Sequence, residues 1–184
     1  APLQHRIDVL RRWRAEFARR QGEIAAALAV DTGRHLIATA EATSVLGMID
    51  HWTKQAPQLA QEEEFPSASQ PTISYRSQYV PYPLVGVISP WNFPVSLCFI
   101  DAIPALLAGC AVFVKPSEVT PRFVEPARRS IEAVPELAAV FQIHAGGRET
   151  GESLVALSDV VCFTGSVATG RLVAENAARH FIPA

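Results

Sequence analysis

The sequence has no excess of basic residues. Its 184 residues include 16 lysines and arginines and 18 aspartates and glutamates, which gives a net charge of −2 at pH 7. Binding to nucleic acid requires basic side chains that neutralise a run of phosphates, so this balance argues against a nucleic-acid partner. The one basic cluster, in residues 6–20, alternates with apolar residues at helical spacing and is interpreted as the solvated face of a helix.

Cysteine is scarce, and long apolar runs are missing. The three cysteines, Cys98, Cys110 and Cys162, have no metal-binding spacing, and we interpret them as small buried hydrophobic residues rather than nucleophiles or metal ligands. An odd set of cysteines without such spacing favours a reducing compartment, so we expect a cytoplasmic protein. The apolar run at residues 24–30 is too short to cross a membrane, and we expect neither a metal nor a membrane partner.

Two common phosphate-binding signatures are absent or incomplete. The glycine fingerprint Gly-x-Gly-x-x-Gly of dinucleotide-binding proteins does not occur. Residues 146–153 have the glycine spacing of a P-loop, but Glu152 stands where the lysine belongs and would repel phosphates. Residues 165–172 lack both the lysine and the hydroxyl that binds magnesium. The sequence therefore does not indicate a nucleotide hydrolase.

The first 82 residues predict helices and then a linker. Apolar residues at helical spacing predict one helix over residues 3–30 and a second that ends near Pro57. Residues 61–71 are polar and contain two prolines, which predicts a linker or an exposed loop. Apolar and polar residues then alternate over residues 73–79, which predicts a half-exposed strand.

From residue 84 onward, short apolar runs alternate with helical segments. The runs at 84–89, 111–115, 140–144 and 160–164 predict four strands, each followed by a helix. Strands that are apolar on both faces and separated by helices are typical of an α/β fold with a doubly wound parallel sheet. Such sheets bind ligands at the carboxyl ends of their strands, where this sequence has polar segments with glycine or proline.

The first of these strands is followed by Ser89-Pro90-Trp91-Asn92-Phe93-Pro94. Two prolines and two aromatic residues make a rigid turn around one amide side chain. A fixed amide donates a hydrogen bond to an oxyanion without a proton-transfer cost, so Asn92 is a candidate oxyanion donor. The alternative is a packed turn without a catalytic role.

The second strand ends in Lys115-Pro116-Ser117-Glu118. The lysine offers a mobile hydrogen-bond donor. A carboxylate after the second strand of a dinucleotide site accepts hydrogen bonds from both ribose hydroxyls and disfavours a 2′-phosphate. The segment also reads as a helix start with Ser117 or Thr120 as the cap, and the two interpretations are compatible.

The fourth strand ends in Phe163-Thr164-Gly165-Ser166, before a predicted helix. Hydroxyl side chains at a helix N-terminus make an anion site, and Gly165 allows the backbone to approach a pyrophosphate. In this order and spacing, the three segments resemble the aldehyde dehydrogenase superfamily over essentially the whole chain. The resemblance extends to Asp31-Thr32-Gly33-Arg34, where the family usually has an acidic-Thr-Gly-Lys sequence, and to the helix end at residues 104–109.

The resemblance implies a fold, a cofactor and a set of site residues. It implies a variant Rossmann sheet with amino-terminal helices, in which residues 1–184 are an incomplete coenzyme-binding domain and residues 61–82 are a linker and a strand of an oligomerisation arm. NAD is the implied cofactor, an aldehyde the implied substrate, and a homo-oligomer the implied assembly. Asn92 is the implied oxyanion donor. The implied NAD contacts are Ile88, Ser89, Pro90 and Trp91 at the nicotinamide, Lys115, Ser117 and Glu118 at the ribose, Gly147 and Gly151 at the adenine, and Phe163, Thr164, Gly165 and Ser166 at the pyrophosphate.

The sequence departs from the family pattern in several respects. Asp101 stands where many members have a lysine, which puts a proton-relay or positioning role there in doubt. In members of the family, a further segment usually precedes the region in which this chain begins. In the family, a general-base glutamate lies in a Glu-Leu-Gly-Gly run, and a nucleophilic cysteine lies in a second domain. Neither residue is present in residues 1–184. We therefore expect this chain alone to have no aldehyde dehydrogenase activity. The alternative is a truncated, non-catalytic relative with a dinucleotide-binding or structural role.

Overall fold

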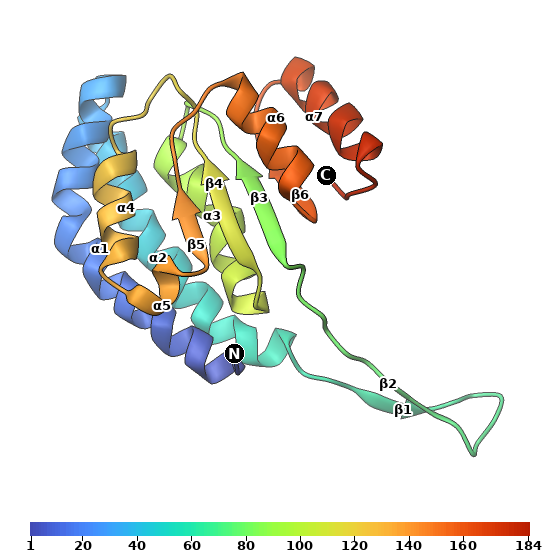
Figure 1. The fold of residues 1–184 in the computed structure, drawn as a ribbon. Helices are drawn as coiled ribbons and strands as arrows, with labels where there is room; N and C mark the ends of the chain where they lie inside the picture. The colour runs from blue at the N-terminus through green and yellow to red at the C-terminus, as the bar shows by residue number, and fades with distance from the viewer.

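Two long helices, a projecting hairpin and an α/β body make up the computed structural model, which describes residues 1–184 (Figure 1). The helices are α1 (Leu3–Thr32) and α2 (His35–Leu59), and the hairpin consists of β1 (Glu64–Pro66) and β2 (Ser74–Arg76). The elements of the body are, in chain order, β3 (Leu84–Ile88), α3 (Pro94–Ala108), β4 (Ala111–Lys115), α4 (Val124–Glu132), α5 (Pro135–Ala138), β5 (Phe141–Ile143), α6 (Arg148–Leu157), β6 (Val160–Phe163) and α7 (Val167–Arg179).

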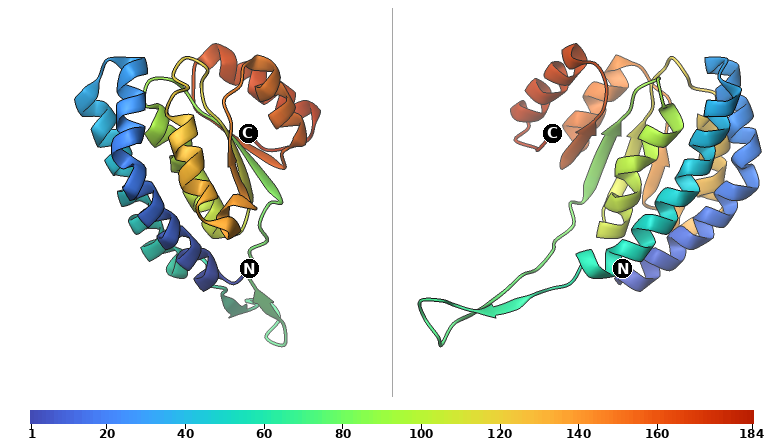
Figure 2. Two further views of the ribbon diagram at one scale, coloured as in Figure 1. Left: turned by 60° about the vertical axis from the view of Figure 1, so that its left-hand side comes forward. Right: turned by 180° about the vertical axis from the view of Figure 1, so that it is seen from behind.

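The body is built on one parallel sheet with the strand order β5-β4-β3-β6. Its four strands lie within one residue of the predicted ranges, and the first two of them, β3 and β4, pair in parallel. Helices cover both faces of the sheet. The helices α1 to α4 lie on one face, and α6 and α7 lie on the other (Figures 1 and 2). The predicted α/β class with a doubly wound parallel sheet is therefore confirmed.

Side chains of the strands alternate between two cores, because successive residues of a strand point to opposite faces. Val85 and Val87 of β3 belong to a core of 34 buried residues on the side of α1 to α5. Val112 and Val114 of β4 join the same core. Ile88 belongs to a smaller core of 6 buried residues on the side of α6 and α7. Both faces are buried, which is why the strands are continuous apolar runs in the sequence.

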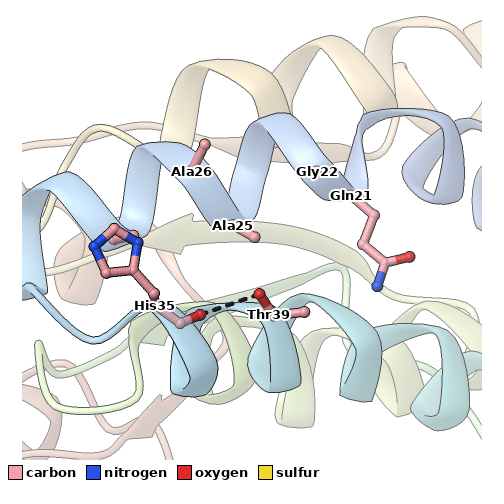
Figure 3. A pocket seen from close by; sticks show the side chains of 7 residues that line it. Gln21, Gly22, Ala25, Ala26, His35 and Thr39 are labelled. Atoms are coloured by element: carbon pink, nitrogen blue, oxygen red, sulfur yellow. Dashed lines mark hydrogen bonds between the residues drawn. The ribbon is translucent and has the colours of Figure 1, made fainter.

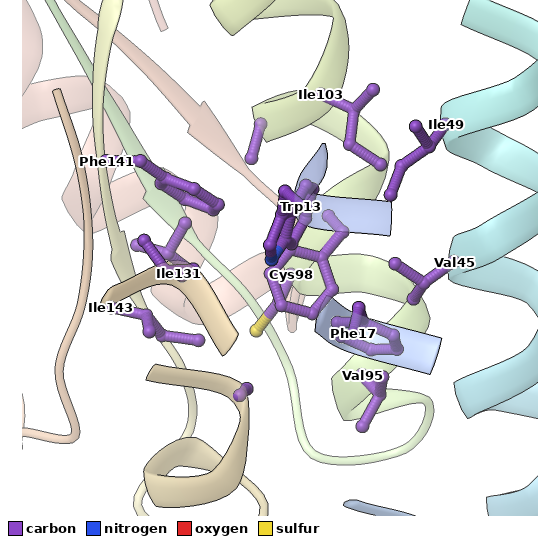
Figure 4. Close-up of a cluster of buried hydrophobic side chains, with 14 of the residues drawn as sticks. Trp13, Phe17, Val45, Ile49, Val95, Cys98, Ile103, Ile131, Phe141 and Ile143 are labelled. Carbon is purple, nitrogen blue, oxygen red and sulfur yellow. The ribbon is translucent and has the colours of Figure 1, made fainter. Parts of the chain in front are cut away.

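The larger core contains a cluster of aromatic rings around Trp13 (Figure 4). Trp13 packs edge-on against Phe17, Phe99 and Phe141, and its ring centroid lies 5.8, 5.5 and 5.5 Å from theirs. All four side chains are fully buried. The Trp13 indole N–H donates to Ser130 Oγ over 3.0 Å, so the polar atom of the ring is satisfied. The cluster ties α1 to α3, α4 and β5.

The helices α1 and α2 are 30 and 25 residues long and extend slightly beyond the predicted ranges. Gly33 ends α1 in the left-handed conformation, with φ 68°, and its N–H donates to the Ala29 carbonyl over 2.8 Å. Pro57 lies in the last turn of α2, close to the predicted end. No helix in the structure is both long enough and apolar enough to span a membrane.

The hairpin projects away from the body (Figures 1 and 2). Its second strand, β2, lies within the predicted strand at residues 73–79 and pairs antiparallel with β1. The polar composition of residues 61–71 indicates a linker or a loop, and this interpretation is wrong for Glu64–Pro66. Three residues that include a proline show no alternation, so a strand this short gives no sequence signal.

The helix after β4 begins later than its sequence signal suggests. It starts at Val124, so neither Ser117 nor Thr120 caps it, and the helix-start interpretation of that segment is wrong. Ser117 Oγ instead accepts a hydrogen bond from the Val119 N–H over 3.3 Å, which tightens the loop after β4. A further short helix, α5, begins at Pro135, because proline is well suited to the first position of a helix.

Replacing Leu10 by alanine is expected to destabilise the protein by about 2–5 kcal/mol, because its buried side chain would leave a cavity. The matched control is Leu36→Ala on α2, where the leucine is 88% exposed and the effect is expected to stay within about 0.5 kcal/mol. Urea unfolding followed by circular dichroism measures both variants. An equal loss of stability in the two would contradict the packing of α1 described here.

Candidate functional site

The strand order creates a crevice between β3 and β6. The connections through α3 and α4 cover one face of the sheet, whereas α6 crosses from β5 to β6 over the other face, and α7 also lies there (Figure 1). The helices that follow the neighbouring strands β3 and β6 therefore leave toward opposite faces. In open α/β sheets, ligands bind at such a switch point, outside the carboxyl ends of the strands.

A cleft of about 1100 Å³ lies at these carboxyl ends. Its lining includes every site residue expected from the sequence: Ile88, Ser89, Pro90, Trp91, Asn92, Lys115, Ser117, Glu118, Gly147, Gly151, Phe163, Thr164, Gly165 and Ser166. These residues come from the loops after β3, β4 and β6 and from the start of α6. The three sequence motifs therefore line one cleft.

The loop after β3 presents an amide side chain at the cleft. Trp91 and Asn92 are exposed, and the only hydrogen bond of Asn92 to a side chain is accepted by its backbone carbonyl. Ser89 is 3% exposed, and its Oγ lies 2.9 Å from Cys98 Sγ, so its hydroxyl is engaged inside the protein. The Asn92 amide is therefore the unpaired polar side chain at the end of β3.

The loop after β4 carries an ion pair at the cleft. Lys115 is buried, and its Nζ donates to the Pro116 carbonyl over 3.0 Å and to Glu118 Oε2 over 3.2 Å. A hydrogen bond from its own backbone amide, followed by the contact with Lys115, lowers the pKa of the exposed Glu118 carboxyl, which is therefore ionised at neutral pH. An ammonium group has three N–H donors, so Lys115 retains one for a ligand.

The turn after β6 opens α7. Ser166 is the N-cap of this helix, and its Oγ accepts from the Thr169 N–H over 3.1 Å. Other N–H groups of the first turn have no acceptor within the helix, and the positive end of the helix dipole lies there, which suits an anion. A Cβ at Gly165 would lie 2.5 Å from Cζ of Phe163, so a larger residue would have to displace the Phe163 ring.

The helix α6 forms another wall of the cleft. Gly147 is its N-cap, and Gly151 packs against Lys115. A Cβ at Gly151 would meet the Lys115 side chain at 3.7 Å, an ordinary contact, so close packing does not require a glycine there. Glu152, which interrupts the P-loop pattern, lies 2.7 Å from Arg148 in an exposed ion pair.

Twelve further residues that the sequence analysis did not name as site residues line the cleft: Val119, Arg148, Glu152, Val155, Ala156, Thr169, Leu172, Val173, Glu175, Asn176, Arg179 and His180. Those at positions 169, 172, 173, 176, 179 and 180 follow one another at spacings of three or one, which makes a stripe along one side of α7. The spacing is visible in the sequence. It does not reveal that the stripe faces a cleft, because that depends on how α7 lies beside α6.

None of the three cysteines lines the cleft. Cys98 and Cys110 are buried and Cys162 is half-buried. Burial raises the pKa of all three thiols, and that of Cys98 to about 12. Asp101 lies outside the cleft as well, half-buried on α3, and its charge is a further cause of the raised pKa of Cys162.

A second, smaller hollow of about 290 Å³ lies between α1 and α2 (Figure 3). It is lined by Gln21, Gly22, Ala25, Ala26, Ala29, His35 and Thr39. Glycine and alanine leave the space between the two helices unfilled, which accounts for the hollow. It shares no residue with the cleft at the strand ends, where the expected site residues lie.

Comparison with known proteins assigns this chain to a family. A model described as "Aldehyde dehydrogenase family" matches residues 1–184. The chain belongs to the aldehyde dehydrogenase family. The resemblance inferred from the three strand-end motifs is therefore confirmed.

Individual relatives match nearly all of this aldehyde dehydrogenase chain. The geranial dehydrogenase of Castellaniella defragrans is 35% identical to it over 185 residues, which are 97% of this chain and 38% of the relative. The structure of the putative aldehyde dehydrogenase PutA from Anabaena variabilis has 52% identity and a TM-score of 0.95, over 99% of this chain and 39% of that chain. The NAD-dependent benzaldehyde dehydrogenase from Corynebacterium glutamicum has 30% identity and a TM-score of 0.87, over 100% of this chain and 40% of that chain. The chain thus spans about two fifths of the length of these relatives.

A thiol reagent at pH 8 is expected to modify Cys98 more than about a thousandfold more slowly in the folded protein than in urea, where an ordinary thiol pKa of about 8.5 leaves roughly a quarter of this cysteine ionised. The reason is that burial excludes the reagent and that a pKa of about 12 leaves on the order of one thiol in 10⁴ ionised. Mass spectrometry of the peptides that contain Cys98, Cys110 and Cys162 measures each rate separately. Rapid labelling of Cys98 in the folded protein would contradict the buried position of this thiol.

Proposed function

We propose that the protein containing this chain oxidises an aldehyde to a carboxylic acid with NAD, and that residues 1–184 belong to its coenzyme-binding domain. The observation that carries the proposal is the convergence of all fourteen expected site residues on one cleft in a member of this family. The aldehyde itself stays open, because similar proteins are named for compounds as different as geranial and benzaldehyde.

The cleft fits a dinucleotide in its charges and hydrogen-bonding groups. The start of α7, with Ser166 as its cap, suits the anionic pyrophosphate. Lys115 and Glu118 offer a donor and an acceptor for a ribose diol, and Ile88 and Phe163 contribute apolar wall. Bound NAD supplies the hydride acceptor, and the residues of this chain hold and orient it.

The charge of Glu118 supports NAD over NADP. A phosphate on the 2′-hydroxyl of the ribose would bring a second negative charge beside the ionised carboxylate. The positive charge of Lys115 does not fully compensate this repulsion, since Lys115 already forms an ion pair with Glu118. Family membership alone leaves the choice open, because a putative succinate-semialdehyde dehydrogenase of Mycolicibacterium smegmatis, 31% identical to this chain, is named for NADP.

In this proposal, Asn92 donates a hydrogen bond from its side-chain amide to the oxyanion that forms when a nucleophile adds to the aldehyde carbonyl. Its amide is neutral, exposed at the cleft and unpaired within the chain, so it meets a developing charge without first breaking another hydrogen bond. The residues that precede it, Ile88 to Trp91, lie on the nicotinamide side of the cleft in the same proposal, which places donor and hydride acceptor side by side.

The proposal extends to the assembly and the compartment. The rings of Phe65 and Tyr75 lie 5.8 Å apart on the two strands of the hairpin, and both side chains are exposed. A projecting hairpin with exposed aromatic rings and unpaired strand edges is suited to pairing with another subunit, so residues 61–82 form the arm of a homo-oligomer. The free thiols support a cytoplasmic location.

NAD is expected to be preferred over NADP by about 1–3 kcal/mol in kcat/KM, and Glu118→Gln is expected to remove most of this preference, because the repelling charge is lost. The measurement is the formation of reduced dinucleotide by the full-length protein with each coenzyme. Glu149→Gln is the matched control, since this exposed carboxylate of α6 does not line the cleft. Equal use of both coenzymes by the unmodified protein would count against the proposed contact.

Asn92→Ala is expected to lower kcat of the full-length protein by about a hundredfold or more, the usual loss for one oxyanion donor, with little change in dinucleotide affinity. Asn92→Asp keeps the shape of the side chain and is expected to lower kcat at least as far, because a carboxylate repels an oxyanion. Steady-state kinetics and dinucleotide titration separate the two effects. Unaltered turnover would leave Asn92 with the packed-turn role alone.

A further inference from the structure

The loop that carries Asn92 is held from the turn between α1 and α2. The guanidinium group of Arg34, the N-cap residue of α2, donates through Nη2 to the backbone carbonyl of Asn92. Its Cζ also lies 5.4 Å from the centroid of the Phe93 ring, within the range of a cation–π contact. Arg34 thus touches two successive residues of the loop, one through a hydrogen bond and one through its planar face.

The same helix holds the residues that follow the loop. Phe93 is the N-cap of α3 and has no side chain that accepts a hydrogen bond. Glu41 of α2 supplies the missing cap, because its Oε2 accepts from the Val95 N–H over 3.0 Å and from the Ser96 N–H over 3.2 Å. Glu41 is 3% exposed, so its Oε2 bonds to these amides rather than to solvent, whereas its buried Oε1 has no hydrogen-bond partner.

These contacts fix the backbone at Asn92 and at the start of α3, and they leave the side-chain amide of Asn92 without a hydrogen-bond partner. A cation of α2 holds the carbonyl of Asn92, and a carboxylate of α2 holds the amides that begin α3. The Asn92 amide itself makes no hydrogen bond to another residue of the chain, although it borders the cleft. A flexible loop would let an unpaired amide move, whereas a stabiliser of a transition state has to be held in place before the reaction.

We infer that Arg34 is a positioning residue: it fixes the backbone at Asn92 so that the side-chain amide is held at the cleft. The inference rests on the proposed function of Asn92 as the oxyanion donor. The α1–α2 turn lies outside the cleft and contributes none of its lining. In this inference the turn nevertheless affects the reaction, because Arg34 positions the oxyanion donor.

The test compares Arg34→Met, Arg34→Lys and the control Arg11→Met in the full-length protein. Methionine keeps the length of the side chain but loses its donors and charge, whereas lysine keeps a cationic donor. Arg11 is an exposed arginine of α1 whose nearest carboxylate is Asp8 on the same helix, and its substitution removes the same charge away from the loop. The readouts are kcat, the Kd of NAD, and hydrogen–deuterium exchange of the amides at residues 92–97.

Arg34→Met is expected to lower kcat by about 10- to 100-fold, as a small misplacement of a catalytic group does, while the Kd of NAD changes less than about twofold. Exchange at residues 92–97 is expected to accelerate, Arg34→Lys to recover most of kcat, and Arg11→Met to behave like the unmodified protein. In an Asn92→Ala background, Arg34→Met is expected to have little further effect on kcat, since both changes act on the same group.

Unchanged kcat and unchanged exchange in Arg34→Met would overturn the inference. A parallel loss of kcat, NAD affinity and overall stability would overturn it as well, because a folding defect alone produces that pattern. If Asn92→Ala leaves turnover unaltered, the proposed function of Asn92 is what fails. The exchange measurement then decides the role of Arg34 alone: faster exchange at residues 92–97 supports it, and unchanged exchange overturns it.

Discussion

The hydrogen bonds between β3 and β6 are the constraint on which the site depends. They align Val85 with Val160 and Ile88 with Phe163, and a further bond from the Thr164 N–H to the Ile88 carbonyl, over 3.0 Å, continues the ladder past the strand ends. The chain therefore leaves both strands at the same level of the sheet. Because α3 and α7 then lie on opposite faces of the sheet, a crevice opens between the two loops. Most of the expected site residues lie at the edges of this crevice.

The depth at which α6 lies on the sheet depends on Gly86 in the centre of β3. A Cβ at this position would lie 2.4 Å from Ser158 Oγ and 3.1 Å from Leu154 Cγ, so a larger residue would require these side chains, or the end of α6 that carries them, to shift. Glycine costs some strand stability, but here it allows close contact between α6 and the sheet. The consequence reaches the cleft, since α6 supplies the wall that contains Gly147 and Gly151.

The amino-terminal helices do more than cover one face of the sheet. At the end of α1, the Asp31 carboxylate accepts from the Arg122 N–H over 2.9 Å and forms an ion pair with the Arg122 side chain. This contact braces the chain beyond the loop after β4, while Arg34 and Glu41 brace the loop after β3. One short turn thus reaches the chain that follows two neighbouring strands, and the hydrogen bonds from Arg34 and Glu41 add to the rigidity that the prolines give the loop after β3.

Local pattern determined most elements of this protein and the identity of several candidate residues. Apolar runs of four or five residues marked β3, β4 and β6, because a strand covered on both faces is mostly apolar. The polar residues at or after the ends of these strands included Asn92, Lys115 and Ser166. These signals need only neighbouring residues.

Tertiary structure alone decided which of these segments meet. Contacts between distant residues determine the strand order and the pairing of β1 with β2. They also determine that the stripe on α7 faces the cleft rather than the core. The same holds for Arg34, which looks like the ordinary start of a helix until the fold places Asn92 beside it. Periodicity identifies the apolar face of a helix, and a motif identifies the functional groups of a loop. Neither identifies the residues that lie against them, because packing between elements depends on the whole core at once.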